Sequence, residues 1–165
     1  MRIFLKCPYC NLEKDIVLYG NESQKEITMA KKCPCGKKME TPDEIRKRLQ
    51  KNGIRKKIFY TMIRQKNGIP VAVKKEGIVF EKYGFTLYAY QKDDTGDISI
   101  CHVIEPTTGL SIQTVSRPLD VVYRYISKAR VEDIKERIKL KDNYYITASK
   151  AFQTADRIET LPEGY

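Results

Sequence analysis

The sequence contains no tryptophan and only one histidine, His102. A single histidine excludes a metal centre built from several histidine ligands, and a Ser-His-Asp triad would have to use this residue. No apolar run approaches the ~18 residues of a membrane-spanning helix, and residues 1–20 lack the pattern of a secretory signal. We therefore expect neither secretion nor membrane insertion, and predict a cytoplasmic protein.

Motifs of common enzymes are also missing. The sequence has no Walker A motif and no glycine-rich nucleotide-binding motif, and residues 147–150 lack the S-x-x-K spacing of a Ser/Lys nucleophile. Four acidic residues are weak candidates for a nuclease centre, but no matching local pattern surrounds them, and we interpret them as ordinary surface carboxylates. They are Asp43, Glu76, Glu81 and Asp97. We expect a binding protein rather than an enzyme.

Positive charge is plentiful and unevenly distributed. The 165 residues include 31 Lys and Arg against 21 Asp and Glu, for a net charge of +10. Residues 41–68 alone hold 9 basic and 2 acidic side chains. Such a concentration is typical of a protein that contacts a polyanion or an acidic surface, because neutralising phosphates releases counterions. A solvated helical face is the alternative.

Four of the five cysteines form two tight pairs, a C-x-x-C at residues 7–10 and a C-x-C at residues 33–35. An odd cysteine count without a secretory signal argues against a disulfide framework. Tight turns beside Pro and Gly present two thiolates each to a tetrahedral metal. We predict one structural zinc ion per chain, held by Cys7, Cys10, Cys33 and Cys35.

Two alternatives to this site stay open. Cys101 or His102 could complete the ligand set, or Cys7 and Cys10 could form a redox pair. The redox alternative is the weaker one, because no βαβ pattern surrounds these two cysteines.

The order of strands and cysteines in residues 1–40 resembles the zinc-ribbon family. Strands are predicted at residues 2–6, 15–19 and 25–30, around the two cysteine turns. Ribbons usually carry C-P-x-C-G at both turns, whereas Asn11 follows the first pair here and the second pair is one residue shorter. The resemblance implies a small sheet built on a structural zinc. Ribbons are similar to parts of transcription, replication and translation machinery, and also serve as protein-docking modules.

Residues 41–68 predict a basic helical hairpin. Thr41 and Glu44 form a capping-box pattern at the start of the first helix, and Ile58 and Met62 share a face of the second. The pentapeptide Gln-Lys-Asn-Gly-Ile occurs at residues 50–54 and 65–69, and we interpret it as the same helix stop used twice.

Basic side chains on this hairpin are the candidate partner contacts. Phosphate contact without base reading, or docking on an acidic protein surface, is favoured over a helix-turn-helix reader. The candidates are Arg46, Lys47, Arg48, Lys51, Arg55, Lys56, Lys57 and Arg64.

From residue 69 the apolar period changes to two, which predicts an antiparallel sheet followed by helices. His102 is flanked by isoleucines in its strand, so we expect a core or boundary histidine. Predicted strands are 70–73, 77–81, 85–90, 97–104 and 110–115, predicted helices are 118–130 and 131–141, and residues 144–146 are either a strand or part of a last helix.

Taken together, these patterns predict an α+β protein. We expect a zinc ribbon at 1–40, a basic helical hairpin at 41–68, and an antiparallel sheet with C-terminal helices on one face at 69–165. In size, lysine-rich composition and accessory zinc knuckle, the chain is similar to small phage accessory proteins, among them the anti-CRISPR inhibitors.

That similarity implies a non-catalytic protein, acting in the host cytoplasm, that binds and inhibits or modulates a nucleic-acid-handling machine such as a CRISPR effector nuclease. The alternative is a zinc-ribbon regulator or processing accessory that binds DNA or RNA directly.

Overall fold

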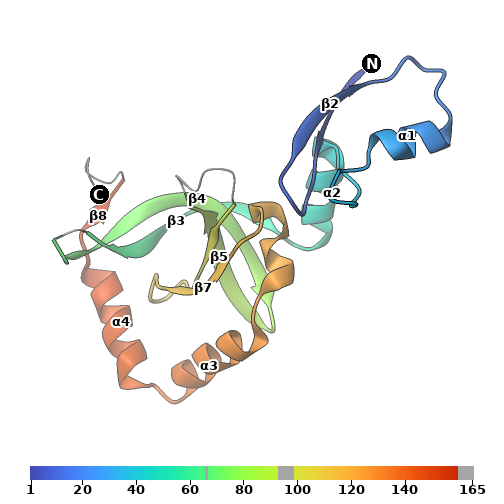
Figure 1. The fold of residues 1–165 in the computed structure, drawn as a ribbon. Coiled ribbons are helices and arrows are strands. Elements are labelled where there is room, and N and C mark those ends of the chain that lie inside the picture. The colour runs from blue at the N-terminus through green and yellow to red at the C-terminus, as the bar shows by residue number, and fades with distance from the viewer. Residues whose placement is uncertain (66, 93–98, 160–165) are drawn as a thin grey trace. The chain divides into compact units, whose positions relative to one another are not determined.

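The computed structural model describes residues 1–65, 67–92 and 99–159. The chain forms two compact units, Met1–Gly53 and Ile54–Tyr165. Both units combine helices with antiparallel strands, so the predicted α+β class is confirmed (Figure 1). The predicted segment 41–68 is not a unit of its own, because its first half belongs to the first unit and its second half to the second.

The first unit is a two-stranded sheet with two helices. Strands β1 (Arg2–Lys6) and β2 (Glu13–Val17) pair antiparallel, and helices α1 (Gln24–Ala30) and α2 (Pro42–Lys51) follow. Its small core contains the buried side chains of Leu5, Met39, Cys7 and Cys33. Two of the four cysteines are therefore part of the core.

Residues 25–30 belong to helix α1, so the predicted third strand at these residues is wrong. The Ser23 hydroxyl accepts a hydrogen bond from the Glu26 N–H, and the Glu26 carboxylate accepts one from the Ser23 N–H at 2.6 Å. This capping box satisfies backbone donors at a helix start. The capping box outweighs the alternation of Ile27 and Met29, so residues 1–40 contain two strands and a helix.

Helix α2 begins as predicted, with the capping box of Thr41 and Glu44. The Arg48 guanidinium donates to both carboxylate oxygens of Glu40, at 3.0 and 2.9 Å. Glu40 in turn exchanges two backbone hydrogen bonds with Lys6 at the end of β1. The helix is thus tied to the strand that leads into the first cysteine turn.

The second unit is built on an antiparallel sheet in the order β3-β4-β5-β6-β7, with the short β8 pairing parallel to β4. Consecutive strands are neighbours, as short connections favour. The strands are β3 (Arg55–Arg64), β4 (Pro70–Lys82), β5 (Phe85–Gln91), β6 (Cys101–Ile104), β7 (Ser111–Val115) and β8 (Arg157–Ile158).

Strand β3 replaces the predicted second helix of the basic hairpin. It pairs with β4 along its whole length, from Arg55 opposite Val79 to Arg64 opposite Pro70. Residues four apart, such as Ile58 and Met62, lie on one face of a strand as well as on one face of a helix. The four-residue spacing therefore does not discriminate between a helix and a strand. A run rich in β-branched and aromatic residues favours the strand.

Other predicted boundaries also move. Strands 70–73 and 77–81 are one strand, β4, and residues 97–98 of the fourth predicted strand lie outside the described residues. The predicted strands 85–90 and 110–115 are confirmed as β5 and β7.

The C-terminal helical region is divided differently from the prediction. It consists of a 3-10 helix η1 (Leu119–Tyr125) and helices α3 (Lys128–Lys139) and α4 (Asn143–Thr154). Ser127 separates the first two, because its hydroxyl caps α3 by accepting from the Arg130 N–H. Residues 144–146 are helical. Segment η1 packs on β4 and β5, and α3 packs on β7. No helix in the described part of the chain is long and apolar enough to cross a membrane.

Candidate metal centre

The first cysteine turn follows directly from β1. The Cys7 N–H donates to the Leu12 carbonyl at 2.8 Å, and the Asn11 N–H donates to the Cys7 carbonyl at 3.1 Å. Asn11 has a φ of 64°, a left-handed conformation that asparagine tolerates better than most residues. It therefore makes the turn that glycine makes in the ribbon pattern.

The second turn closes in the same way although it is one residue shorter. The Cys33 N–H donates to the Lys37 carbonyl at 2.8 Å, and the Gly36 N–H donates to the Cys33 carbonyl at 2.9 Å. Gly36 has a φ of 91° and follows its cysteine pair directly, as Asn11 follows the first pair. The shorter spacing thus still brings both Cys33 and Cys35 to the site.

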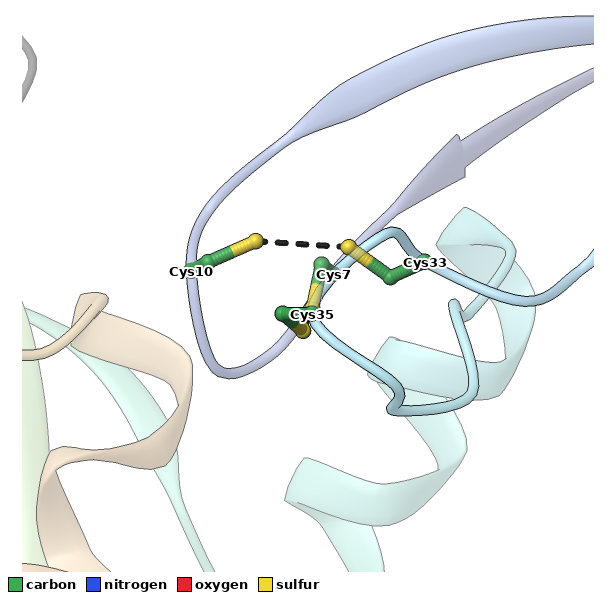
Figure 2. Close-up of side chains that lie close together, drawn as sticks. All are labelled: Cys7, Cys10, Cys33 and Cys35. Atoms are coloured by element: carbon green, nitrogen blue, oxygen red, sulfur yellow. Dashed lines mark hydrogen bonds between the residues drawn. The ribbon is translucent and has the colours of Figure 1, made fainter.

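The four cysteine side chains converge (Figure 2). All four sulfur atoms lie within 4.8 Å of one another. The Sγ atoms of Cys7 and Cys35 are 3.6 Å apart, and those of Cys10 and Cys33 are 3.4 Å apart. A tetrahedral ion with metal–sulfur bonds of about 2.3 Å needs sulfur–sulfur separations of about 3.8 Å. The cluster could therefore hold a metal ion with little rearrangement.

All four candidate ligands belong to the first unit, so the set is complete without Cys101 or His102. Cys101 is buried in the second unit, where its thiol donates to the Arg117 carbonyl at 3.3 Å. The alternative in which one of these residues supplies a ligand is not needed to explain the site.

The local environment shifts the pKa values of these thiols in opposite directions. Burial raises the pKa of Cys7 and of Cys33, because a thiolate is poorly solvated there. At Cys35 the backbone N–H of Lys37 stabilises the thiolate and lowers the pKa to about 7. Cys35 therefore ionises readily, whereas the two buried thiols need a cation as counter-charge. A metal ion bound here would displace their protons.

The eight basic candidates for partner contact fall into two groups of four. Arg46, Lys47, Arg48 and Lys51 lie on α2 in the first unit, and Arg55, Lys56, Lys57 and Arg64 lie on β3 in the second. Arg46 pairs with Asp43 at 2.8 Å at the surface. The Arg48 side chain is only 12% exposed in its pair with Glu40, so its contact is internal.

His102 takes the boundary position that the sequence predicts. It is half-buried, its ring centroid lies 5.4 Å from that of Tyr90, and its Nδ1 is 3.3 Å from the Ser111 hydroxyl. Burial, followed by the charges of Lys92 and Lys75, lowers its pKa.

The residues that surround His102 are not among those that the sequence pattern singles out. Phe59, Lys75, Tyr88 and Tyr90 come together on one face of the sheet. In the sequence, the two-residue spacing of Lys57 and Phe59, and of Tyr88 and Tyr90, is compatible with one face of a strand in each segment. The sequence predicts a helix around Ile58 and Met62, which does not place Phe59 in the sheet beside Tyr88 and Tyr90.

Comparison of the chain with protein-family models, with curated proteins and with solved structures gives no match.

Proposed function

We propose that this protein is a non-catalytic, zinc-binding accessory protein that docks on a machine that handles nucleic acid. The convergence of four cysteine thiols supports the metal-binding part of the proposal, and the exposed basic residues of α2 support the docking part. Four thiolates are a ligand set that tetrahedral zinc favours, and they leave no open position at which the ion could activate water. Such an ion acts on folding rather than on a reaction.

Zinc has a clear structural task in the first unit. The core there is small, since Leu5 and Met39 are its only fully buried large apolar side chains among the described residues. An ion bound to both turns links β1 to the segment before α2, and its binding free energy becomes folding free energy.

Helix α2 offers the docking surface in this proposal. Its Arg48–Glu40 pair holds it against β1, while Lys47 and Lys51 are exposed. Exposed cations on an anchored helix attract a partner of negative potential. An acidic surface of a nucleic-acid-handling protein, or of its nucleoprotein complex, fits this charge.

The test combines metal analysis with capture of partners. Chelator-free protein should contain about one zinc per chain. Iron in place of zinc, or no metal, would contradict the proposal. The tagged protein is then used to capture partners with and without nuclease. A purified CRISPR effector ribonucleoprotein is tested as one defined candidate partner.

Variants locate the docking surface. Lys47→Glu combined with Lys51→Glu should abolish capture, whereas the matched reversal of the exposed Lys25 and Lys139 should not. A partner that survives nuclease supports protein docking. A partner that nuclease removes supports the second candidate function, direct nucleic-acid binding. The aromatic and basic residues around His102 in the second unit favour that candidate.

A further inference from the structure

One face of the sheet in residues 54–165 gathers aromatic and basic side chains. Phe59 on β3 lies opposite Lys75 on β4, and Tyr90 on β5 lies opposite His102 on β6. Residues two apart on a strand share a face, so Lys57 joins Phe59. We call this set the aromatic–lysine face: Lys57, Phe59, Lys75, Tyr88, Tyr90 and His102.

The rings of this face touch across three strands. The centroid of Phe59 lies 4.9 Å from that of Tyr88 and 6.2 Å from that of Tyr90, although β4 separates their strands. Gly77 on β4 makes this possible, because a Cβ there would lie 3.0 Å from the Phe59 ring and 1.9 Å from the Ala89 carbonyl oxygen. Phe59 and Tyr90 are buried beneath this face, whereas Tyr88 and His102 are only partly buried and keep some exposed ring surface.

Lysines accompany the rings. The Lys57 ammonium lies 5.8 Å from the centroid of Tyr88, and the Lys75 ammonium lies 5.2 Å from that of Tyr90. Burial, followed by the charges of Lys92 and Lys75, lowers the pKa of His102 and so favours the neutral imidazole. The face therefore combines neutral rings with positive charge, which disfavours a cationic ligand and suits an anionic one that carries planar groups.

We propose that the aromatic–lysine face binds single-stranded nucleic acid. Unpaired bases stack on the partly exposed rings of Tyr88 and His102, and phosphates bind Lys57 and Lys75. The exposed Lys57 side chain is flexible enough to move from the ring to a phosphate without a change in the backbone. In a duplex the flat faces of the bases are already stacked on one another, so a duplex could use only the lysines.

This site is independent of the metal centre and of α2. All its residues lie in the second unit, whereas the cysteines and α2 lie in the first. The α2 docking proposal and the single-strand binding proposal can therefore be tested separately. Reversal of charge on α2 should leave binding to a free oligonucleotide unchanged, and variants of the aromatic–lysine face should leave the metal content unchanged.

The test measures fluorescence anisotropy with the full-length protein. The probes are fluorescein-labelled oligo-dT and oligo-U of about 16 nucleotides, which exceeds most site sizes for single strands. Unlabelled competitors are the same strand, a duplex of equal length and inorganic polyphosphate. We expect the single strand to compete at least about tenfold better than the other two.

Two substitutions at Tyr88 distinguish stacking on the aromatic ring from simple filling of space by the side chain. Tyr88→Leu should weaken binding about tenfold, while Tyr88→Phe should retain it because the ring remains. The matched control is Tyr144→Leu on α4, an exposed tyrosine with the Arg137 guanidinium 5.5 Å from its ring centroid. Thermal melting of each variant confirms that it is folded.

Charge is tested through the salt dependence. Lys57→Gln with Lys75→Gln should reduce the log–log slope of affinity against salt by about 1.4, since each phosphate contact on a single strand contributes about 0.7. The same change at the exposed Lys128 and Lys139 on α3 should leave the slope unaltered.

Four results would overturn the proposal. They are absence of oligonucleotide binding by the wild-type protein, equal competition by duplex or polyphosphate, equal affinity of the Tyr88→Leu and Tyr144→Leu variants, and an unaltered slope in the double lysine variant. Capture of a protein partner by the same preparation in any of these cases would leave the α2 docking proposal standing.

Discussion

Arg48 and Glu40 join helix α2 to the strand that leads into the first cysteine turn. Two nitrogen atoms of the guanidinium bind the two carboxylate oxygens, and the side chains are 12% and 16% exposed. The backbone of Glu40 pairs with Lys6, immediately before Cys7. The position of α2 and the position of the cysteines are thereby coupled through one ion pair.

Arg48→Ala should lower the free energy of unfolding by about 1.5–3 kcal/mol, the range for hydrogen bonds to charged groups. The matched control, Arg46→Ala, removes the exposed pair with Asp43 and should cost no more than about 1 kcal/mol. Urea unfolding of the metal-loaded protein measures both. Equal effects of the two substitutions would contradict an anchoring role for Arg48.

Removal of the metal should unfold the first unit. We expect a strong chelator, or Cys7→Ser, to abolish protection from amide exchange in residues 1–53, because the ion and two buried cysteines form much of that unit's core. Cys101→Ser is the control and should retain the metal, since Cys101 lies in the other unit.

Cys35→Ser tests the shorter second turn by itself. Loss of metal affinity is the expected result, measured by competition with a chromogenic chelator. Full retention of affinity would show that a group other than Cys35 supplies the fourth ligand.

Gly77→Ala should destabilise the second unit by about 1–3 kcal/mol, since its Cβ would lie 1.9 Å from the Ala89 carbonyl oxygen and would force the strands apart. Gly68→Asn provides the contrast, because nothing lies within 4 Å of its Cβ position and asparagine tolerates a positive φ. Thermal melting compares the two, and a neutral Gly77→Ala variant would contradict the close crossing of Phe59 over β4.

Acidification should destabilise the protein through His102. Its folded-state pKa is lowered from 6.5 by burial and by Lys92 and Lys75, so the unfolded chain binds the proton more tightly. The stability that the neutral imidazole contributes is fully present above pH 6.5 and is lost as the pH falls through the folded-state pKa. Urea unfolding at pH 7.5 and about pH 5 should show a smaller loss for His102→Gln than for the wild-type protein.

The metal centre could be predicted from the sequence because its geometry is local. Each pair of cysteines lies within one turn, and Asn11 and Gly36 turn the backbone at equivalent positions. The aromatic–lysine face could not be predicted in this way. Its residues lie on four strands, and only the pairing of β3 with β4, and of β5 with its neighbours, brings them to one face.

The repeated pentapeptide separates what the sequence by itself determined from what the tertiary structure decided. In both copies the glycine has a positive φ, 68° at Gly53 and 83° at Gly68. In both copies its N–H donates to the glutamine carbonyl three residues earlier, at 3.1 and 2.8 Å. The local turn is thus a property of the pentapeptide, because asparagine and glycine favour this bend wherever they occur together.

What the chain does around that turn is decided by distant residues. The first copy ends helix α2, whereas the second connects β3 to β4. A ten-residue segment such as Arg55–Arg64 gains little from its own helical hydrogen bonds in water, and a full ladder of bonds and buried side chains from β4 favours the strand. Short-range chemistry therefore determined the turns, the caps and the cysteine cluster, and long-range strand pairing decided the sheet and the face that it carries.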